Sequence, residues 1–297
     1  MLAVVQFYWS AVVLLLPLLA CAGIGAYWAK REYPFGGTFI TMLVTTVTTP
    51  ALVFHTFVTT QLDDRALLAI AGASLLALLA CALACAGLLR LFGLPVRTLL
   101  PTAFVPNAGN LGLPVSQLAF GDAGLSAAVA FFAVNSFVTH TIAVRMLPGA
   151  NTPGSWKSPV LLASVAAVSL RALDIPVPDW LVATSRMLGA VTVPLMLLSL
   201  GHALALIPAN GMRAGAVVAG LRLAVGLAAG YAVVWLLGLP DLLAGALALQ
   251  MAMPCAVVSY MYARRYTDVG DIAAGAVLVS TVVFLLLAPA LLWFTRQ

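Results

Sequence analysis

The residues best suited to chemistry in this chain form one run, Asn107-Ala108-Gly109-Asn110-Leu111-Gly112-Leu113-Pro114. It lies inside an apolar stretch from about residue 98 to residue 120, long enough to cross a bilayer as one helix. Glycine costs a helix backbone entropy and proline removes a donor, so we expect the helix to break here. Broken backbone is tolerated in hydrocarbon only where it is buried in protein or lines a polar cavity. The run therefore predicts a binding site at mid-membrane depth, with candidate substrate contacts at Asn107, Gly109, Asn110, Gly112 and Pro114.

The composition excludes a soluble fold. Of 297 residues, 63% are hydrophobic and 8% are charged, against roughly 25% charged in an ordinary soluble domain. The net charge of +5 is spread along short loops, which argues against a nucleic-acid partner and leaves the lipid bilayer as the main surroundings. Four cysteines lie in apolar stretches and are expected to be small buried hydrophobic residues rather than disulfides or metal ligands. They are Cys21, Cys81, Cys85 and Cys255.

Apolar runs between charge and turn clusters predict an all-α polytopic membrane protein with ten transmembrane helices. They cover approximately residues 7–29, 38–58, 66–92, 98–120, 123–147, 158–173, 180–207, 212–238, 241–262 and 270–295. No Lys or Arg precedes Lys30, so the first run is expected to be a spanning helix rather than a signal peptide. A hydrophilic gap divides the chain into a first five-helix unit, residues 1–148, a linker loop, residues 149–157, and a second unit, residues 158–297.

The two units repeat one another in sequence. Val47-Thr48-Thr49-Pro50-Ala51-Leu52 matches Val191-Thr192-Val193-Pro194-Leu195-Met196. Asn110-Leu111-Gly112-Leu113-Pro114 matches Gln250-Met251-Ala252-Met253-Pro254 in the same order along the chain. Because each unit has an odd number of spans, the second must enter the membrane from the opposite side, which makes an inverted repeat.

Basic residues predict the orientation. Loops after odd-numbered spans hold Lys30, Arg31, Arg90, Arg97, Arg145, Lys157, Arg213, Arg264 and Arg265. The other loops and the termini hold only Arg65, Arg171, Arg186 and Arg296. Basic loops favour the cytoplasmic side, so we expect a multi-pass protein of the cell (inner) membrane with both termini on the extracytoplasmic side.

An inverted repeat would bring the broken helices 4 and 9 together at the midplane, where they would cross. Half-helices that start after Pro114 and Pro254 would present unsatisfied N–H groups and a partial positive charge. Each such end favours an anion by ~0.3–1 kcal/mol, against ~2.5–3.5 kcal/mol for placing a charge at the bilayer centre. Asparagine and glutamine amides could offset the rest, so the crossing predicts a seat for a small organic anion. The second run adds Gln250, Met251 and Pro254 as candidates, although the Gln250 amide could instead bond a neighbouring helix.

Further polar residues lie inside the predicted spans. Arg222 could receive a substrate carboxylate, or it could pair with carbonyl groups or extend to the cytoplasmic interface. Pro50 and His55, which follows it closely, are further candidate substrate contacts, and His55 is a candidate for proton coupling or for a structural hydrogen bond. Asn135 and the pair Ser280-Thr281 hold similar places in spans 5 and 10, where they could face the crossing or bond their own backbone.

At these residues the chain resembles the auxin efflux carrier family, also called the membrane transport protein family, which includes plant PIN carriers and bacterial malate and malonate permeases. The matching features are the run ending at Pro114, Phe120-Gly121, the stretch Pro194-Leu195-Met196-Leu197-Leu198-Ser199-Leu200-Gly201, the motif Met253-Pro254-x-Ala256-Val257, and Ser280-Thr281. They extend over most of the chain.

The resemblance implies ten helices in two inverted five-helix repeats, similar to the bile acid sodium symporter and crossover antiporter folds. It implies a scaffold of spans 1, 2, 6 and 7, a mobile transport domain of spans 3–5 and 8–10, organic carboxylates as substrates, and a homodimer. It places Asn107, Asn110, Pro114 and Pro254 at the crossing. The chain lacks the long central loop of the plant carriers and a clear acid within the membrane, so the coupling ion, Na⁺ or H⁺, stays open.

We therefore expect a secondary active transporter that moves an auxin-like, malate-like or malonate-like carboxylate by an elevator type of alternating access. The alternative is a sodium-coupled symporter of the same fold for bile-acid-like or other amphipathic acids, with Na⁺ near Asn110, Gln250, Ser280 and Thr281. No other cofactor is expected. An enzyme is not expected either, because the spans show no paired carboxylates, Ser/His arrangement or metal cluster.

Overall fold

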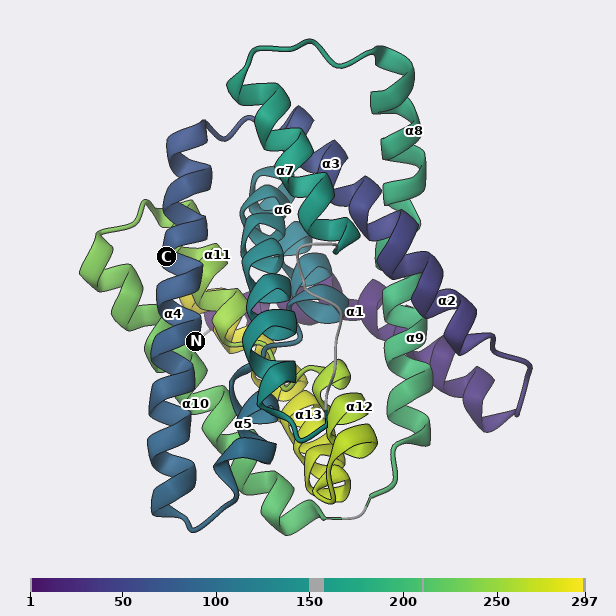
Figure 1. Cartoon of the computed structure of the whole chain (residues 1–297), viewed down its shortest axis with the longest axis vertical. Coiled ribbons are helices and arrows are strands. Elements are labelled where there is room, and N and C mark those ends of the chain that lie inside the picture. Colours follow the sequence, from purple (N-terminus) through teal and green to yellow (C-terminus); the bar gives the residue numbers. More distant parts are fainter. Residues whose placement is uncertain (1, 150–157, 210, 296–297) are drawn as a thin grey trace.

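A computed structural model describes residues 2–149, 158–209 and 211–295 of the chain. The described residues are almost entirely helical and contain no β-strand (Figure 1). The all-α fold expected from the apolar runs is confirmed. Most of the predicted linker loop, residues 150–157, lies outside the described residues.

The helices follow the predicted spans closely. The first half holds α1 (Leu2–Lys30), α2 (Gly37–Leu43), η1 (Val44–Thr48), α3 (Thr49–Thr59), α4 (Asp64–Leu91), α5 (Val96–Phe104), η2 (Ala108–Gly112), α6 (Leu113–Val138), η3 (Thr139–Ala143) and η4 (Val144–Met146). The second half holds α7 (Pro159–Ala172), α8 (Asp179–Ala190), α9 (Thr192–Leu206), α10 (Met212–Leu237), α11 (Asp241–Met251), α12 (Val257–Tyr266) and α13 (Gly270–Thr295).

Six helical stretches of the described chain are long and apolar enough to cross a membrane. They are Gly37–Thr59, Asp64–Leu91, Ala108–Met146, Asp179–Leu206, Met212–Leu237 and Gly270–Leu292. Of the other predicted spans, the first is the single helix α1, whereas the fourth, sixth and ninth are short or broken. The sixth is only the 14-residue α7, and the ninth is divided into α11 and α12, neither of which reaches spanning length.

A sharp turn inside α6 separates the fourth and fifth predicted spans. Gly121 has φ 65° and ψ −155°, a conformation that side chains with a Cβ atom disfavour. Glycine makes the turn possible within a single residue, so the second part of the broken span and the following span are joined without a loop.

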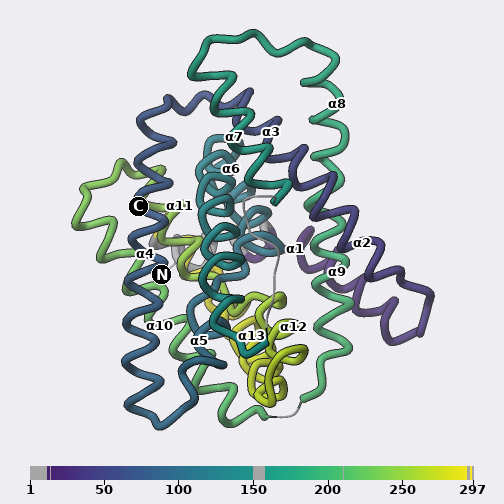
Figure 2. The backbone as a smooth tube through the Cα atoms, in the orientation of Figure 1, coloured from purple at the N-terminus to yellow at the C-terminus, as the bar shows by residue number. Residues whose placement is uncertain are grey.

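The helices pack as two groups. One group contains α1, α2, α3, α7, α8 and α9, with α1 packed on α9 and α7 packed on α3. The other contains α4, α5, α6 and α10 to α13, with α10 packed on both α4 and α13. In Figure 1 α2, α8 and α9 lie on the right and α4, α10 and α11 on the left, and Figure 2 shows the same separation of the backbone. The groups touch mainly where η2 meets α9, where α6 meets α3 and α7, and where α1 meets α13.

Helices α1 and α9 approach each other closely enough for backbone contact. A Cβ atom on Gly201 would lie 1.8 Å from the carbonyl oxygen of Ala22, and one on Gly25 would lie 2.0 Å from that of Leu198. Small residues at such contacts let helices pack by van der Waals attraction, which matters where lipid removes the hydrophobic driving force.

Gly201→Ala should therefore lower the thermal midpoint of the purified protein in detergent by several degrees. The added methyl group meets backbone that cannot move aside, and overpacking costs ~1–3 kcal/mol or more. Gly23→Ala is the matched control, because a Cβ atom at Gly23 of α1 meets nothing within 4 Å. Equal midpoints for the two variants would contradict the close approach.

Candidate functional site

The breaks in the fourth and ninth predicted spans are joined by hydrogen bonds. Pro106 and Cys255 form an isolated antiparallel β-bridge. The Asn107 N–H donates to the Pro254 carbonyl at 2.8 Å, and the Ala256 N–H donates to the Val105 carbonyl at 3.2 Å. These two bonds satisfy backbone groups that broken helices would leave unpaired inside a membrane.

The prolines explain where the breaks occur. A residue before proline is driven out of the α region, and proline cannot donate to the preceding helical turn. Val105, before Pro106, has extended backbone with φ −79° and ψ 114°. The first break therefore lies at residues 105–107, and the following half-helix begins at Ala108 rather than after Pro114, which lies in the first turn of α6. The expected start after Pro114 was wrong because Pro106 already forces Val105 out of the helical conformation, so the next half-helix begins before Pro114. In the second half, α12 begins at Val257, close to the expected Pro254.

Only a small part of the first break is open. Between Pro101 and Ser116 every residue is buried except Gly109 and Asn110. A Cβ atom on Gly109 would lie 2.9 Å from Phe132 Cε2 of α6 and 3.7 Å from Met196 Cε of α9. The accessible face of η2 is therefore directed toward α9, across the boundary between the two helix groups.

Asn107 stands at the N-terminus of this half-helix. It is the residue before η2, its side chain makes no capping hydrogen bond, and it is 4% exposed. Its Nδ2 atom is buried and finds no partner within the described chain. A buried amide donor at the positive end of a helix is a ready partner for an anionic oxygen.

Gln250 connects the two halves instead of facing the open side. Its Nε2 atom donates to Ser116 Oγ at 3.1 Å, across the break from α11 to α6. A Cβ atom on Gly112 would lie 2.2 Å from Gln250 Oε1, so Gly112 provides the space that this amide occupies. The structure contains the bond to a neighbouring helix that was one of the two roles predicted for Gln250, while its Oε1 atom is buried without a partner in the described residues.

Ser280 supports the second break. Its hydroxyl accepts from the Cys255 N–H at 3.0 Å, so α13 satisfies a backbone group that the β-bridge leaves free. The adjacent Thr281 hydroxyl is buried and has no partner in the described residues. Asn135, 5% exposed, likewise has an unpartnered Oδ1. It lies one helical turn beyond Phe132, the ring that meets Gly109.

Arg222 is fully buried and is bonded to the ends of both broken helices. Its Nη1 donates to the Phe104 carbonyl at 2.6 Å and to Cys81 Sγ at 3.4 Å. Its Nη2 donates to the Met251 carbonyl, and its Nε donates to the Met253 carbonyl at 3.2 Å. Arg222 thus pairs with carbonyl groups, which is one of the roles predicted for it. Its guanidinium does not extend to the cytoplasmic interface.

Pro50 and His55 lie in the other helix group. Pro50 is in the first turn of α3, after the widened helical turn η1, and His55 lies beside Val182 and Arg186 of α8. Three buried threonine hydroxyls have no partner in the described chain. They lie where η1 meets α3 and where α9 begins, at Thr48, Thr49 and Thr192. Helix α9 contacts both η1 and η2, so it lies between η1 and the first break.

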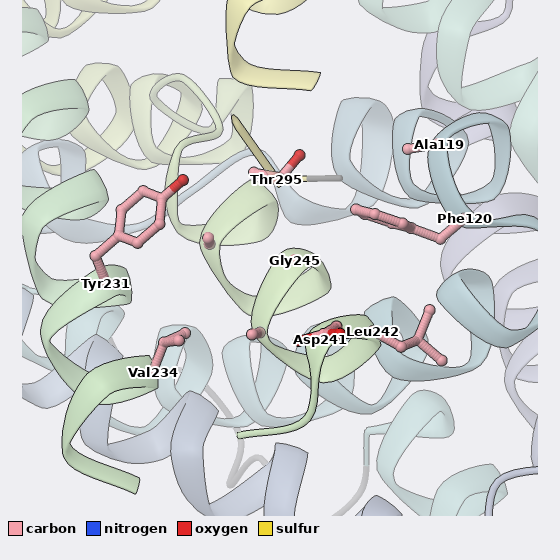
Figure 3. Close-up of a pocket in the computed structure, with 10 residues that line it drawn as sticks. Ala119, Phe120, Tyr231, Val234, Asp241, Leu242, Gly245 and Thr295 are labelled. Atoms are coloured by element: carbon pink, nitrogen blue, oxygen red, sulfur yellow. The ribbon is translucent and has the colours of Figure 1, made fainter. Parts of the chain in front are cut away.

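A cavity of about 540 Å³ lies at one end of α11 (Figure 3). Tyr231 and Val234 line one side and Phe120 and Leu242 the other. The lining contains none of the residues of the two breaks, so the cavity is separate from the candidate site. No group of three or more His, Cys, Asp or Glu residues in the described parts of the chain is arranged to hold a metal ion.

Long apolar helices, two of which are interrupted and hydrogen-bonded to each other inside the protein, define a polytopic membrane protein with irregular backbone at membrane depth, an arrangement typical of carriers. A family model for membrane transport proteins matches residues 10–156 and 154–292. The chain belongs to this family and is a membrane transporter, which confirms the resemblance drawn from its motifs. A search of curated proteins gave no match.

The neighbouring hydroxyls of Ser280 and Thr281 offer a test of the geometry at the second break. Ser280→Ala should destabilise the protein by about 1–3 kcal/mol, because it leaves the buried Cys255 N–H without an acceptor. Thr281→Val removes a hydroxyl that has no partner and keeps its shape, so it should change stability little. Thermal midpoints in detergent, measured in parallel, check both. A Thr281→Val variant as unstable as Ser280→Ala would contradict the specific role of the hydrogen bond from the Cys255 N–H to Ser280.

Proposed function

We propose that the chain is a secondary transporter that carries a small organic carboxylate and binds it at the N-terminal end of the half-helix that begins at Ala108. The observation that carries this proposal is Asn107, whose buried amide donor is unpartnered at that end. The proposed contacts are the Asn107 amide, the first free N–H groups of η2, and the Asn110 side chain at the accessible face.

Magnitudes support reversible binding of an anion. One helix N-terminus in a partly buried geometry contributes up to ~2 kcal/mol, and a hydrogen bond from an amide to a charged group contributes ~1.5–3 kcal/mol. Together they offset the ~2.5–3.5 kcal/mol that a charge costs at the bilayer centre. The surplus is small, which suits a carrier because the cargo must also leave.

We further propose that the ten predicted spans form two inverted repeats whose broken helices cross at the β-bridge, and that transport is of the elevator type. In support, α1 packs on α9 while α7 packs on α3, so the first helix of each half contacts the second span of the other. The group of α4 to α6 and α10 to α13 would then move against the group of α1 to α3 and α7 to α9. The open face at Gly109 lies on the boundary between these groups.

The sodium site, the coupling ion, the homodimer and the inner-membrane orientation stay predictions. Among the residues named for sodium, Ser280 has a protein partner, whereas Gln250 Oε1 and the Thr281 hydroxyl have none in the described residues. Sodium dependence must therefore be measured together with carboxylate binding.

Thermal stabilisation of the purified protein by malonate, malate and indole-3-acetate tests the proposal. The measurements should be made with sodium or choline as the cation and at two pH values, which separates the sodium-coupled alternative. We expect at least one carboxylate to raise the midpoint. Stabilisation by none of a broad carboxylate panel, including amphipathic acids, would overturn the anion assignment.

Asn107→Ala should weaken the binding of that carboxylate by about tenfold or more and reduce its uptake into proteoliposomes, because a hydrogen bond to a charged group is lost. The fold should survive, since the Asn107 side chain makes no capping bond. Thr102→Val is a matched control. It removes a buried hydroxyl of α5 that has no partner in the described residues. The C-terminal end of α5 lies at the same break, and a helix C-terminus does not favour an anion. An equal loss of binding in both variants would remove Asn107 from the site.

A further inference from the structure

The Arg222 guanidinium is a buried positive charge with no acidic partner among the described residues. It is 0% exposed and is the largest fully buried side chain in the described part of the chain. The ion pair found in the described residues joins Arg171 to Asp64, far along the sequence from this position. A lone buried cation is costly, so its charge must be balanced by other groups.

Helix ends provide that balance. Phe104 is the last residue of α5 and Met251 is the last residue of α11, and both carbonyls accept from Arg222. Each helix C-terminus carries roughly half a negative charge, so two of them amount to about one. One guanidinium therefore neutralises both half-helix ends, and Met253 and Cys81 occupy further donors.

Space for this arrangement is built into α10. A Cβ atom on Gly226 would lie 2.3 Å from Arg222 Nη2 and 2.4 Å from the Met251 carbonyl oxygen. Any larger residue at position 226 would force the guanidinium and the α11 end apart. The missing side chain at Gly226 thus leaves the space in which the Arg222 guanidinium meets the Met251 carbonyl.

The consequence concerns the charge of the site. Four half-helix ends meet at the breaks, two C-terminal and negative, two N-terminal and positive, and without a cation their fields would largely cancel. We infer that Arg222 is the positioning residue that makes the site select anions. It cancels the C-terminal ends, so the N-termini at Ala108 and Val257 act on the substrate unopposed, although Arg222 does not touch the substrate. This inference rests on the proposed carboxylate function.

Cys81 offers a way to change the charge while keeping the fold. Cys81→Asp places a carboxylate beside the guanidinium, and Cys81→Asn places a neutral side chain of the same size there. The binding of malonate and of indole-3-acetate is compared with that of their neutral amides, malonamide and indole-3-acetamide. Cys81→Asp should bind the carboxylate about tenfold more weakly than Cys81→Asn, while affinity for the amide is equal in the two variants.

Arg222→Gln and Arg222→Lys give a second, independent comparison. The Gln variant should lose the preference for the carboxylate over its amide, and the Lys variant, which keeps the charge, should retain most of it. If carboxylate and amide affinities fall together in Cys81→Asp, or in Arg222→Gln, Arg222 has only a structural role and the inference fails while the proposed function stands. If the wild-type protein binds no carboxylate, the proposed function itself fails.

Discussion

Two backbone hydrogen bonds between residues 105–107 and 254–256 are the contact on which the rest of this membrane protein depends. A helix broken inside hydrocarbon exposes donors and acceptors that lipid cannot satisfy. Here each break supplies the partner for the other, and the neighbouring side chains complete the pairing: Ser280 accepts from Cys255, and Arg222 donates to the ends of α5 and α11. The irregular backbone can persist at membrane depth because it is shared between two distant parts of the chain.

The polar residues of the break fall into two roles. Gln250, Ser116, Ser280 and Arg222 are bonded to protein groups and hold the half-helices in place. Asn107 Nδ2 and Asn135 Oδ1 are buried without a partner in the described residues, and so is Gln250 Oε1, although Gln250 also bonds Ser116 through Nε2. Buried polar atoms in folded proteins usually have a partner, so each of these atoms is a candidate contact for a bound group or water. The free Asn107 amide at the start of η2 supports the proposal that the substrate binds at the end of the half-helix that begins at Ala108.

Packing within and between the two helix groups determines which face of the first break is accessible. Gly201 and Gly25 bring α1 and α9 into backbone contact, which joins the two halves of the chain within one group. Gly226 and Gly230 leave room on α10 for Arg222 and Met251 in the other group. The first break opens only at Gly109 and Asn110, where η2 lies against α9. A site on the boundary between two separately packed groups is suited to being uncovered from either side.

The sequence by itself determined the helical membrane fold, the outer limits of most spans, the two broken helices and the family, because apolar run length, glycine and proline act locally. Side-chain partners were not predictable from it. Gln250 and Arg222 were each compatible with binding substrate or protein, and only the tertiary structure brings Ser116 to the first and three carbonyls to the second. The position of the first break also depended on tertiary structure. Pro106 and Pro114 are both able to interrupt a helix, and pairing with Cys255 from the other half of the chain selects Pro106.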